Sequence, residues 1–464
     1  MKQRILGVAA VISVVAVWAC SSGSGGSATG GDAGNDTGGG SDSGSSSGSA
    51  SSSGSSSGSS SGGSSGGSSG SSSGSGGSSG SSSGGNPGPT WTMIDLMDDP
   101  AGGSPQALKG NATVAGIWFS STTNGDVALI PNAEATAGAI EHLSSAKAVD
   151  SIALSGSAQN DDSYDAIWMA GGTLYANSRT NGAQANVSAD NGKTFKQNAS
   201  SVSGTPNAGW IWLSKDSAAN WHLVDDIGNV WTSTTGPVAT TTWTRTWQPE
   251  ATPPVPDPVP AADCQSSWHQ DYFAADAQQG FFVSSDGKTM VYNSGADGFT
   301  GVCRSTDGGN NFVPVTFPSP PNPSSDGESP TVILFTSDKD GIAAWANDLE
   351  AANSAYVYFT ADGGATWKLA TMPTMAAQFA FTTGFAAPDG QHIWVGGFTN
   401  DSPPNLVLWK SSDGGKTWKD VSAALTTANA GAMYKVHTGF ALDANNIWVG
   451  GDNGGLAYSP TGGE

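Results

Sequence analysis

The residues of this sequence best equipped for chemistry gather in one short segment, Ser411–Trp418, which places an Asp carboxylate among Ser and Thr hydroxyls. Such a cluster suggests a nucleophile with its base, or oxygen ligands for a cation such as calcium. Near copies of the segment occur at three other places in the chain, 188–195, 305–312 and 360–367. A reaction centre has no need of four copies, so we interpret the segment as a structural repeat.

The repeat has the pattern Ser/Thr-x-Asp-x-Gly-x-Thr-Trp/Phe and recurs at a regular spacing. Asp307 and Asp362 are 55 residues apart, and Asp362 and Asp413 are 51 apart. A unit of this length that holds several short strands is typical of a propeller blade of four antiparallel strands. We therefore predict an all-β fold, a single β-propeller of seven four-stranded blades over residues 90–464, with the second blade beginning at about Ile152.

The two ends of the predicted propeller together make one further copy of the repeat. Residues 459–464 followed by Thr90-Trp91 rebuild the eight-residue pattern, with Thr461 in place of the Asp. This arrangement predicts that the N-terminal strand is the outermost strand of the last blade and closes the ring, leaving few exposed strand edges. The alternative is that Thr90-Trp91 matches the pattern by coincidence.

The repeat resembles the Asp-box of the bacterial-neuraminidase-repeat propellers, which include sialidases, sortilin and photosystem II assembly factors. The resemblance implies that each box closes the turn between the third and fourth strands of a blade, and that its aromatic residue packs between sheets. The residues concerned are Asp190, Asp307, Asp362, Asp413, Trp367 and Trp418. A short carboxylate accepts backbone N–H bonds across its own turn while Gly supplies the positive φ, so we interpret these aspartates as structural and assign no catalytic residue.

No bound metal or other cofactor is predicted. The Asp-x-Asp-x-Asp-Gly spacing of a calcium loop is absent, and the five histidines show no spacing typical of zinc ligands. Metal bound by the clustered aspartates is the alternative.

The N-terminus, residues 1–20, has the layout of a secretory signal, with two basic residues followed by a short apolar run. Val17-Trp18-Ala19-Cys20 resembles a bacterial lipobox, which implies that Cys20 is lipidated. Ser21 after the Cys suits the outer membrane by the same resemblance. We therefore expect an exported outer-membrane lipoprotein that faces the periplasm or the cell surface; the alternative is an ordinary secreted protein in which Cys20 is incidental.

Residues 21–89 consist almost entirely of Ser and Gly. Such a segment has too little apolar surface to offset the entropy of ordering, so it predicts a disordered tether. The whole chain carries 17 basic and 39 acidic residues, a net charge of -22. A chain this acidic is repelled by nucleic acid and by anionic headgroups, so we expect no nucleic-acid partner, membrane contact only through the lipid anchor, and a monomer.

Cys264 and Cys303 are the only cysteines besides Cys20. In an oxidising compartment two such thiols are expected to pair, so we predict a disulfide. Two free buried thiols are the alternative.

The few arginines of the chain argue against sialidase activity, which is one function of the family that the repeat resembles. Its sialidases clamp the substrate carboxylate with three arginines, for which the guanidinium fork is well suited. Beyond the signal peptide this chain has only Arg179, Arg245 and Arg304, and Arg304 directly precedes a box. Sialidase activity is therefore disfavoured.

The prediction for function is a non-catalytic surface propeller that binds an unknown protein or glycan partner. The alternative is a glycoside hydrolase that acts on extracellular polysaccharide through a carboxylate pair, which the many acidic residues leave open.

Overall fold

The structure is a computed structural model and describes residues 90–96, 112–131, 139–146, 151–155, 164–170, 172–178, 185–197, 210–225, 230–235, 243–247, 264, 281–294, 301–319, 330–345, 355–374, 379–429, 431 and 433–464. The predicted signal peptide with Cys20 lies outside these residues, as does the whole of the predicted tether, residues 21–89. Those assignments therefore stay predictions.

The described strands form seven four-stranded antiparallel sheets, which we number in chain order. The first four sheets contain β2 (Ala112–Ser121), β3 (Asn124–Pro131), β4 (Ala139–Leu143) and β5 (Ser151–Ser155); β6 (Tyr164–Ala170), β7 (Thr173–Ser178), β8 (Ala185–Ser188) and β9 (Lys196–Gln197); β10 (Trp210–Lys215), β11 (Trp221–Asp225), β12 (Val230–Ser233) and β13 (Thr244–Trp247); and β14 (Phe281–Val283), β15 (Met290–Ser294), β16 (Gly301–Ser305) and β17 (Val313–Val315). The last three contain β18 (Pro330–Phe335), β19 (Gly341–Trp345), β20 (Tyr356–Thr360) and β21 (Lys368–Leu369); β22 (Phe379–Ala386), β23 (Ile393–Thr399), β24 (Leu406–Ser411) and β25 (Lys419–Asp420); and β26 (Val436–Ala441), β27 (Ile447–Gly451), β28 (Leu456–Ser459) and β1 (Thr92–Ile94). The predicted all-β fold of four-stranded antiparallel sheets is confirmed.

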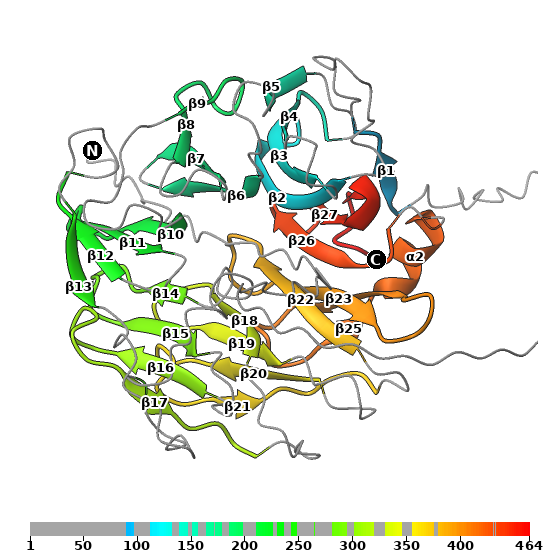
Figure 1. Ribbon diagram of the computed structural model, residues 1–464. Coiled ribbons are helices and arrows are strands. Elements are labelled where there is room, and N and C mark those ends of the chain that lie inside the picture. The colour runs from blue at the N-terminus through cyan, green and yellow to red at the C-terminus, as the bar shows by residue number, and fades with distance from the viewer. Residues whose placement is uncertain are drawn as a thin grey trace, which may run out of the picture. The chain divides into compact units, whose positions relative to one another are not determined.

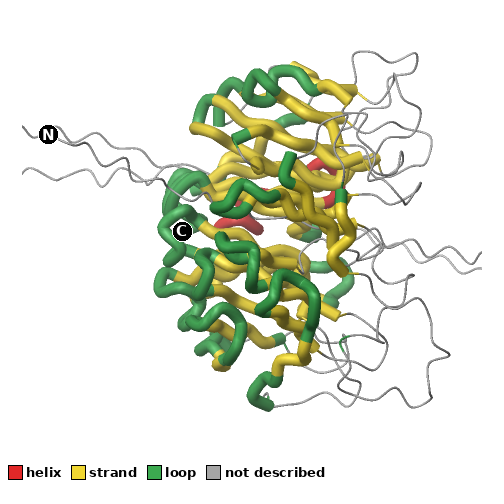
Figure 2. Tube along the Cα trace, turned by 90° about the vertical axis from the view of Figure 1, so that its left-hand side faces the viewer, coloured by secondary structure: helices red, strands yellow, loops and turns green. Residues whose placement is uncertain are grey.

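Within each sheet neighbouring strands are also consecutive in the chain, except where β1 joins the seventh. Antiparallel order brings the box turns, and the turns between first and second strands, to one end of the sheets, which we call the box end. The turns between second and third strands lie at the other end, the far end, where the first strands also begin. Figure 2 shows most of the described turns gathered at one end, together with the C-terminus.

Burial follows the position of a strand within its sheet. Every residue of β19 and of β24 is buried, as expected for strands covered on both faces by neighbouring sheets. The fourth strands are short, and both residues of β25 are exposed. The apolar core therefore lies between the sheets, along their first three strands.

The sheets pack on one another in sequence and return to the first (Figure 1). β18 contacts β22, β22 contacts β26, and β26 contacts β2 of the first sheet. At this last joint Trp448 stacks on Phe119 of the first sheet with ring centroids 3.7 Å apart. Trp448 Nε1 also donates to the carbonyl oxygen of Ala146, at 3.1 Å.

Helices contribute little. α2 (Ser422–Asn429) joins the sixth sheet to the seventh, and the 3-10 helix η3 (Asp452–Gly454) follows β27. Neither these nor any other helix of the described residues has the length and apolar content that crossing a bilayer requires.

The N-terminal strand closes the seventh sheet. β1 pairs with β28 through Thr92 and Tyr458, Met93 and Ala457, and Ile94 and Leu456. Trp91, just before β1, is 2% exposed. The predicted place of the N-terminal strand as the outermost strand of the last sheet is confirmed.

One boundary predicted from the sequence is wrong. Ile152 was expected to open the second blade, but it lies in β5, the fourth strand of the first sheet, and pairs with Glu141 of β4. The second sheet begins with β6 at Tyr164. The first sheet has no Asp motif to mark its last turn, so the sequence held no signal that separates a fourth strand from the next first strand.

The closing strand gives a test of the ring. Trp91→Ala is expected to lower the free energy of unfolding by about 3 to 5 kcal/mol, because a fully buried Trp side chain is lost and a cavity remains. Urea unfolding followed by fluorescence measures this. Val313→Ala is the matched control, since Val313 is 59% exposed. Deleting residues 90–97 should lower the melting temperature further, and an unchanged melting temperature would contradict closure by β1.

Candidate functional site

Each Asp box closes its own turn with a recurring set of hydrogen bonds. Asp413 Oδ1 accepts from the backbone N–H of Thr417 at 2.9 Å and of Lys416 at 3.1 Å, and Oδ2 accepts from the Thr417 hydroxyl at 2.7 Å. The Ser411 hydroxyl donates to Oδ1 at 2.8 Å and accepts from the N–H of Gly415 at 2.9 Å. Equivalent bonds hold the carboxylates of Asp190, Asp307 and Asp362. Both carboxylate oxygens are thus engaged within the turn.

These hydrogen bonds lower the pKa of the box carboxyls. The hydroxyl of Thr194 is the main cause at Asp190, and the side-chain amide of Asn311 is the main cause at Asp307. At Asp413 burial raises the pKa, but the combined hydrogen bonds outweigh it and leave the pKa below its usual value. An ionised acceptor is what a turn cap needs, whereas a general acid needs a raised pKa.

The second glycine of a box receives a side chain from the preceding sheet. Gly415 has φ of +86°, and a β carbon there would overlap Ile342 of the fifth sheet. A β carbon on Gly364 would lie 3.1 Å from Cγ2 of Val291 in the fourth sheet. Glycine is therefore required at this position for two reasons: its backbone has a positive φ, and a side chain of the neighbouring sheet approaches it closely.

The tryptophans of two boxes are buried beside their own turns. Trp367 is 3% exposed and Trp418 is 7% exposed. Nε1 of Trp367 donates to the Gly364 carbonyl at 3.1 Å, and Nε1 of Trp418 donates to the Gly415 carbonyl at 2.9 Å. The aromatic residue thus supports the turn that precedes it.

The incomplete copy at the C-terminal end of the seventh sheet keeps the hydroxyl half of the turn. Ser459 Oγ accepts from the N–H of Thr461 at 3.2 Å and of Gly463 at 3.0 Å. Gly462 and Gly463 both have positive φ, like the glycines of the complete boxes. Trp394 of the sixth sheet donates its indole N–H to the Gly462 carbonyl at 3.1 Å.

A buried Asp–His pair occupies one joint between sheets. Asp126 Oδ1 lies 3.1 Å from Nδ1 of His142, and the two residues are 0% and 5% exposed. Such a pair could orient a base beside a nucleophile. Here a β carbon on Gly192, in the box of the second sheet, would overlap the Asp126 carboxylate. The Asp126 carboxylate therefore packs against the box glycine of the next sheet, as Ile342 packs against Gly415. We interpret the Asp126–His142 pair as structural.

Cys264 and Cys303 form a disulfide with an S–S distance of 2.07 Å. The bond joins Cys264 to β16, the third strand of the fourth sheet. The hydroxyl of Tyr292 also donates to the Cys264 carbonyl at 2.8 Å. The structure thus has the predicted pairing and not the alternative of two free thiols.

The arginines of the described residues take part in packing. Arg304 Nε donates to the Gly363 carbonyl of the fifth sheet at 2.7 Å. Arg245 lies in β13 of the third sheet, over the Trp231 ring at 5.7 Å. Arg179 lies outside the described residues. Arg245 and Arg304 therefore do not converge as a carboxylate clamp.

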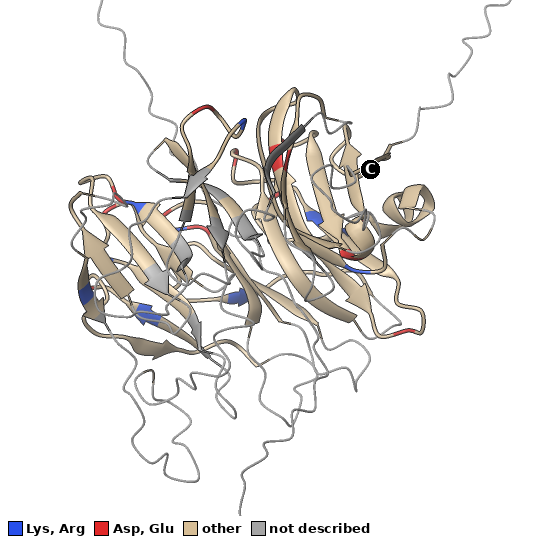
Figure 3. Ribbon diagram, turned by 45° about the horizontal axis from the view of Figure 1, so that its top comes forward, with Lys and Arg blue, Asp and Glu red and all other residues tan. Residues whose placement is uncertain are grey.

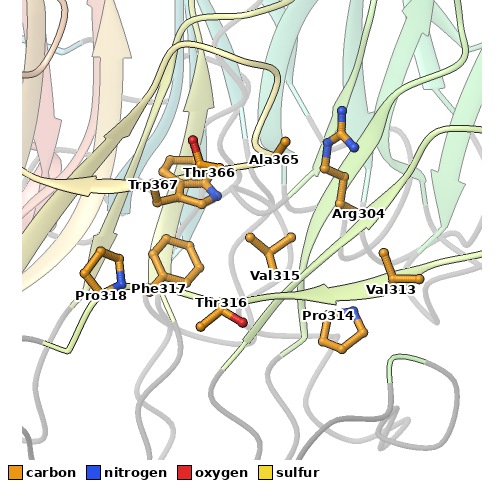
Figure 4. Close-up of a pocket in the computed structure, with 10 residues that line it drawn as sticks. All are labelled: Arg304, Val313, Pro314, Val315, Thr316, Phe317, Pro318, Ala365, Thr366 and Trp367. Atoms are coloured by element: carbon orange, nitrogen blue, oxygen red, sulfur yellow. The ribbon is translucent and has the colours of Figure 1, made fainter.

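A groove of about 510 Å³ runs between β17 and the box turn of the fifth sheet. Figure 4 shows the ring of Phe317 next to Trp367 and the Arg304 side chain at the other side of the groove. None of the residues that line it carries a carboxyl or an imidazole, so the groove is not a site for acid–base chemistry. Pro314 lies in the edge strand β17 and has no N–H to offer a further strand.

The candidate site is at the far end of the seventh sheet, where a three-residue segment, Met433–Lys435, is held by four hydrogen bonds. The side-chain amide of Asn429 donates to the Met433 carbonyl at 2.6 Å and accepts from its N–H at 2.8 Å. Asp452 Oδ1 accepts from the N–H of Tyr434 at 2.7 Å and of Lys435 at 3.0 Å. The Tyr434 side chain is nevertheless 39% exposed.

The charged groups at this segment are one basic residue, Lys435, and one acidic residue, Asp452. Lys435 Nζ lies 4.3 Å from the centroid of the Phe398 ring. His437 is buried, and burial, with a smaller contribution from Lys435, lowers its pKa to about 4, against an opposing effect of Asp452. His437 is therefore neutral near pH 7. Figure 3 shows basic and acidic positions scattered over the described ribbon without a large patch of one sign.

The segment 433–435 was not predicted from the sequence. Its hydrogen-bond partners are Asn429 and Asp452, which come from a helix before β26 and a turn after β27. No repeat or motif marks such a segment. The only available signal was that Tyr434 lies in a connection between sheets, away from the buried aromatic positions of the blades.

The box turn generates a stability prediction. Asp413→Ala is expected to lower the free energy of unfolding by about 2 kcal/mol, because four donors of the turn lose a charged acceptor. Thermal or urea unfolding measures the change. Asp401→Ala is a control on an exposed aspartate of the sixth sheet, and an equal effect of the two substitutions would argue against the capping role.

His437 generates a prediction for pH. Its pKa is about 4 in the folded protein against 6.5 for the unfolded chain, so the unfolded state binds the proton more tightly and stability falls as pH drops from about 6.5 towards 4. The contribution is about 3 kcal/mol at full titration. The free energy of unfolding is measured at pH values of about 6.5 and about 4 for the parent protein and for the His437→Gln variant. A pH dependence that is the same in the two proteins would contradict this assignment.

Comparisons with known proteins bear on the fold. No family model and no curated protein matches the chain. Among solved structures, YCF48 from Cyanidioschyzon merolae matches with a TM-score of 0.52 and 12% identity over 80% of this chain and 98% of that one. The GH74 xyloglucanase from Xanthomonas campestris matches with a TM-score of 0.46 and 15% identity, over 80% of this chain and 53% of the xyloglucanase. The YCF48 match, together with the sheets described above, shows that this chain has a β-propeller fold.

Proposed function

We propose that the protein is a non-catalytic propeller that binds a protein or glycan partner at the far end of its sheets. In this proposal lipidated Cys20 anchors the chain in the outer membrane and residues 21–89 tether the propeller to that anchor. The observation that carries the proposal is the division between the two ends. The box carboxylates are used within their own turns, while the far end carries the partly exposed Tyr434 on a segment fixed by four hydrogen bonds.

The hydrogen bonds of this segment favour recognition. A backbone that is already held by hydrogen bonds has less conformational entropy to lose when its residues contact a partner. Tyr is also among the side chains most often found at the energetic centre of binding surfaces. A merely structural connection would not require its largest apolar side chain to remain in solvent.

The carboxyl groups support binding rather than hydrolysis. A glycoside hydrolase needs one carboxyl of raised pKa beside a second carboxylate. Eight aspartates of the described part of the chain have a lowered pKa, namely Asp190, Asp216, Asp286, Asp307, Asp362, Asp389, Asp413 and Asp443. These groups suit hydrogen-bond acceptors and do not suit the proton donor of that reaction.

The test uses full-length lipidated protein purified in detergent. Immobilised protein is screened against bacterial cell-surface proteins and against polysaccharides. The same polysaccharides are incubated with the protein and assayed for release of reducing sugar. The expected result is saturable binding without release, weakened at least tenfold by Tyr434→Ala. Sugar release that is abolished by substitution of a single carboxylate would refute the non-catalytic proposal.

The proposed anchoring is tested by fractionating the bacterial cells that produce the protein. Cys20→Ser is expected to move the protein from the membrane fraction to the soluble fraction, while Ser22→Ala leaves it in the membrane fraction. Retention of the Cys20→Ser protein in the membrane would contradict lipidation at this residue.

A further inference from the structure

The surface around Tyr434 combines one aromatic ring with polar groups. Tyr434 is the only large apolar side chain with high exposure at the far end of the described sheets; the other such residue, Val313, lies on the outer strand β17. Lys435 follows Tyr434 in the chain, and Asp452 accepts from the Tyr434 N–H. A single aromatic ring surrounded by hydrogen-bonding groups differs from the contiguous apolar centre of a protein interface.

Asp452 has one oxygen available for a ligand. Its Oδ1 accepts the N–H bonds of Tyr434 and Lys435. No residue of the described chain donates to Oδ2 of this carboxylate, and Asp452 is only partly buried. The carboxylate therefore fixes the backbone of Tyr434 and Lys435 through one oxygen, and its other oxygen remains an acceptor.

Lys435 supplies the complementary donor. Its ammonium group lies over the Phe398 ring, 4.3 Å from the centroid, and no described carboxylate forms an ion pair with it. A cation held over an aromatic face keeps hydrogen-bond donors directed away from the ring. Donor and acceptor thus belong to the same short surface region as Tyr434, because Lys435 follows Tyr434 in the chain and Asp452 accepts from the backbone N–H of both residues. Their charges are opposite.

We infer that this surface, formed by Tyr434, Lys435 and Asp452, binds one ring of a neutral carbohydrate. The apolar C–H face of the sugar stacks on the Tyr434 ring. Its hydroxyls accept from Lys435 Nζ and donate to Asp452 Oδ2. The inference rests on the proposed binding function and narrows its partner from protein or glycan to a neutral glycan.

Charge excludes an acidic sugar as the preferred ligand. The local cation is matched by the carboxylate of Asp452, and the whole chain has a net charge of -22, which repels anions. A neutral sugar meets no such barrier. An acidic polysaccharide is therefore the counter-probe of choice.

The experiment measures binding of the full-length protein to soluble β-glucan, xylan and mannan, with hyaluronan as the acidic counter-probe, by affinity electrophoresis. The expected result is retardation by at least one neutral polysaccharide and none by hyaluronan. Tyr434→Ala should weaken the retardation about tenfold or more, and Tyr434→Phe should stay within about twofold, because the ring is what stacks. Val313→Ala, the other exposed apolar residue, is the matched control and should change nothing.

The outcomes separate this inference from the proposed function. Retardation that survives Tyr434→Ala, with an unchanged melting temperature of the variant, overturns the site but leaves a glycan-binding propeller. Capture of a protein partner through Tyr434, without retardation by any of the neutral polysaccharides, overturns the glycan assignment and leaves the binding function. Stronger retardation by hyaluronan than by the neutral polysaccharides overturns the inference that the ligand is a neutral carbohydrate.

Discussion

The structure depends on the hydrogen-bonded box turn, in which one hydroxyl and one carboxylate take up the N–H groups of a tight turn. Because these bonds are local, eight residues fix the turn and start the fourth strand. The second glycine of the same turn leaves room for a side chain of the preceding sheet, such as Ile342 against Gly415. One segment thus orders both a sheet and its joint with the neighbouring sheet. Where the full motif is missing, part of it remains: Ser459 keeps the hydroxyl bonds, and the turn at Ala146 is held from the seventh sheet by Trp448.

This use of carboxylates changes how the acidity of the chain is to be interpreted. The turns of Asp190, Asp307, Asp362 and Asp413 supply donors that stabilise the ionised carboxylates, so these charges are used in building the sheets. A large negative charge therefore does not by itself indicate a ligand for these groups. The informative charges are those that do not belong to the repeat, such as Lys435 over the Phe398 ring and Asp452 beside Tyr434.

The parts of the structure that were predictable from sequence are those with short-range causes. The box aspartates and their tryptophans were identifiable because every partner lies within eight residues. The split copy at Ser459 and Trp91 placed β1 because it repeated the same pattern across the chain ends. Ile152 was assigned to the wrong sheet because an apolar strand looks the same as a fourth strand or a first strand when no box separates them.

Long-range placements left no such trace in the sequence. Asp452 fixes Tyr434 and Lys435 from 18 and 17 residues away, and Asn429 fixes Met433 from the end of α2. The Asp126–His142 pair likewise depends on the register of β3 with β4. These contacts follow from strand pairing and sheet packing, which composition and spacing do not encode.

The position of β1 has a mechanical consequence. The chain enters β1 at the box end, whereas Tyr434 lies at the far end of the same sheet. A pull between the preceding chain and a partner held at Tyr434 therefore acts along β1 and β28 in opposite directions. The three residue pairs that join these strands are then sheared together and share the load, instead of opening one after another. The strand that closes the ring is also the one placed to resist tension.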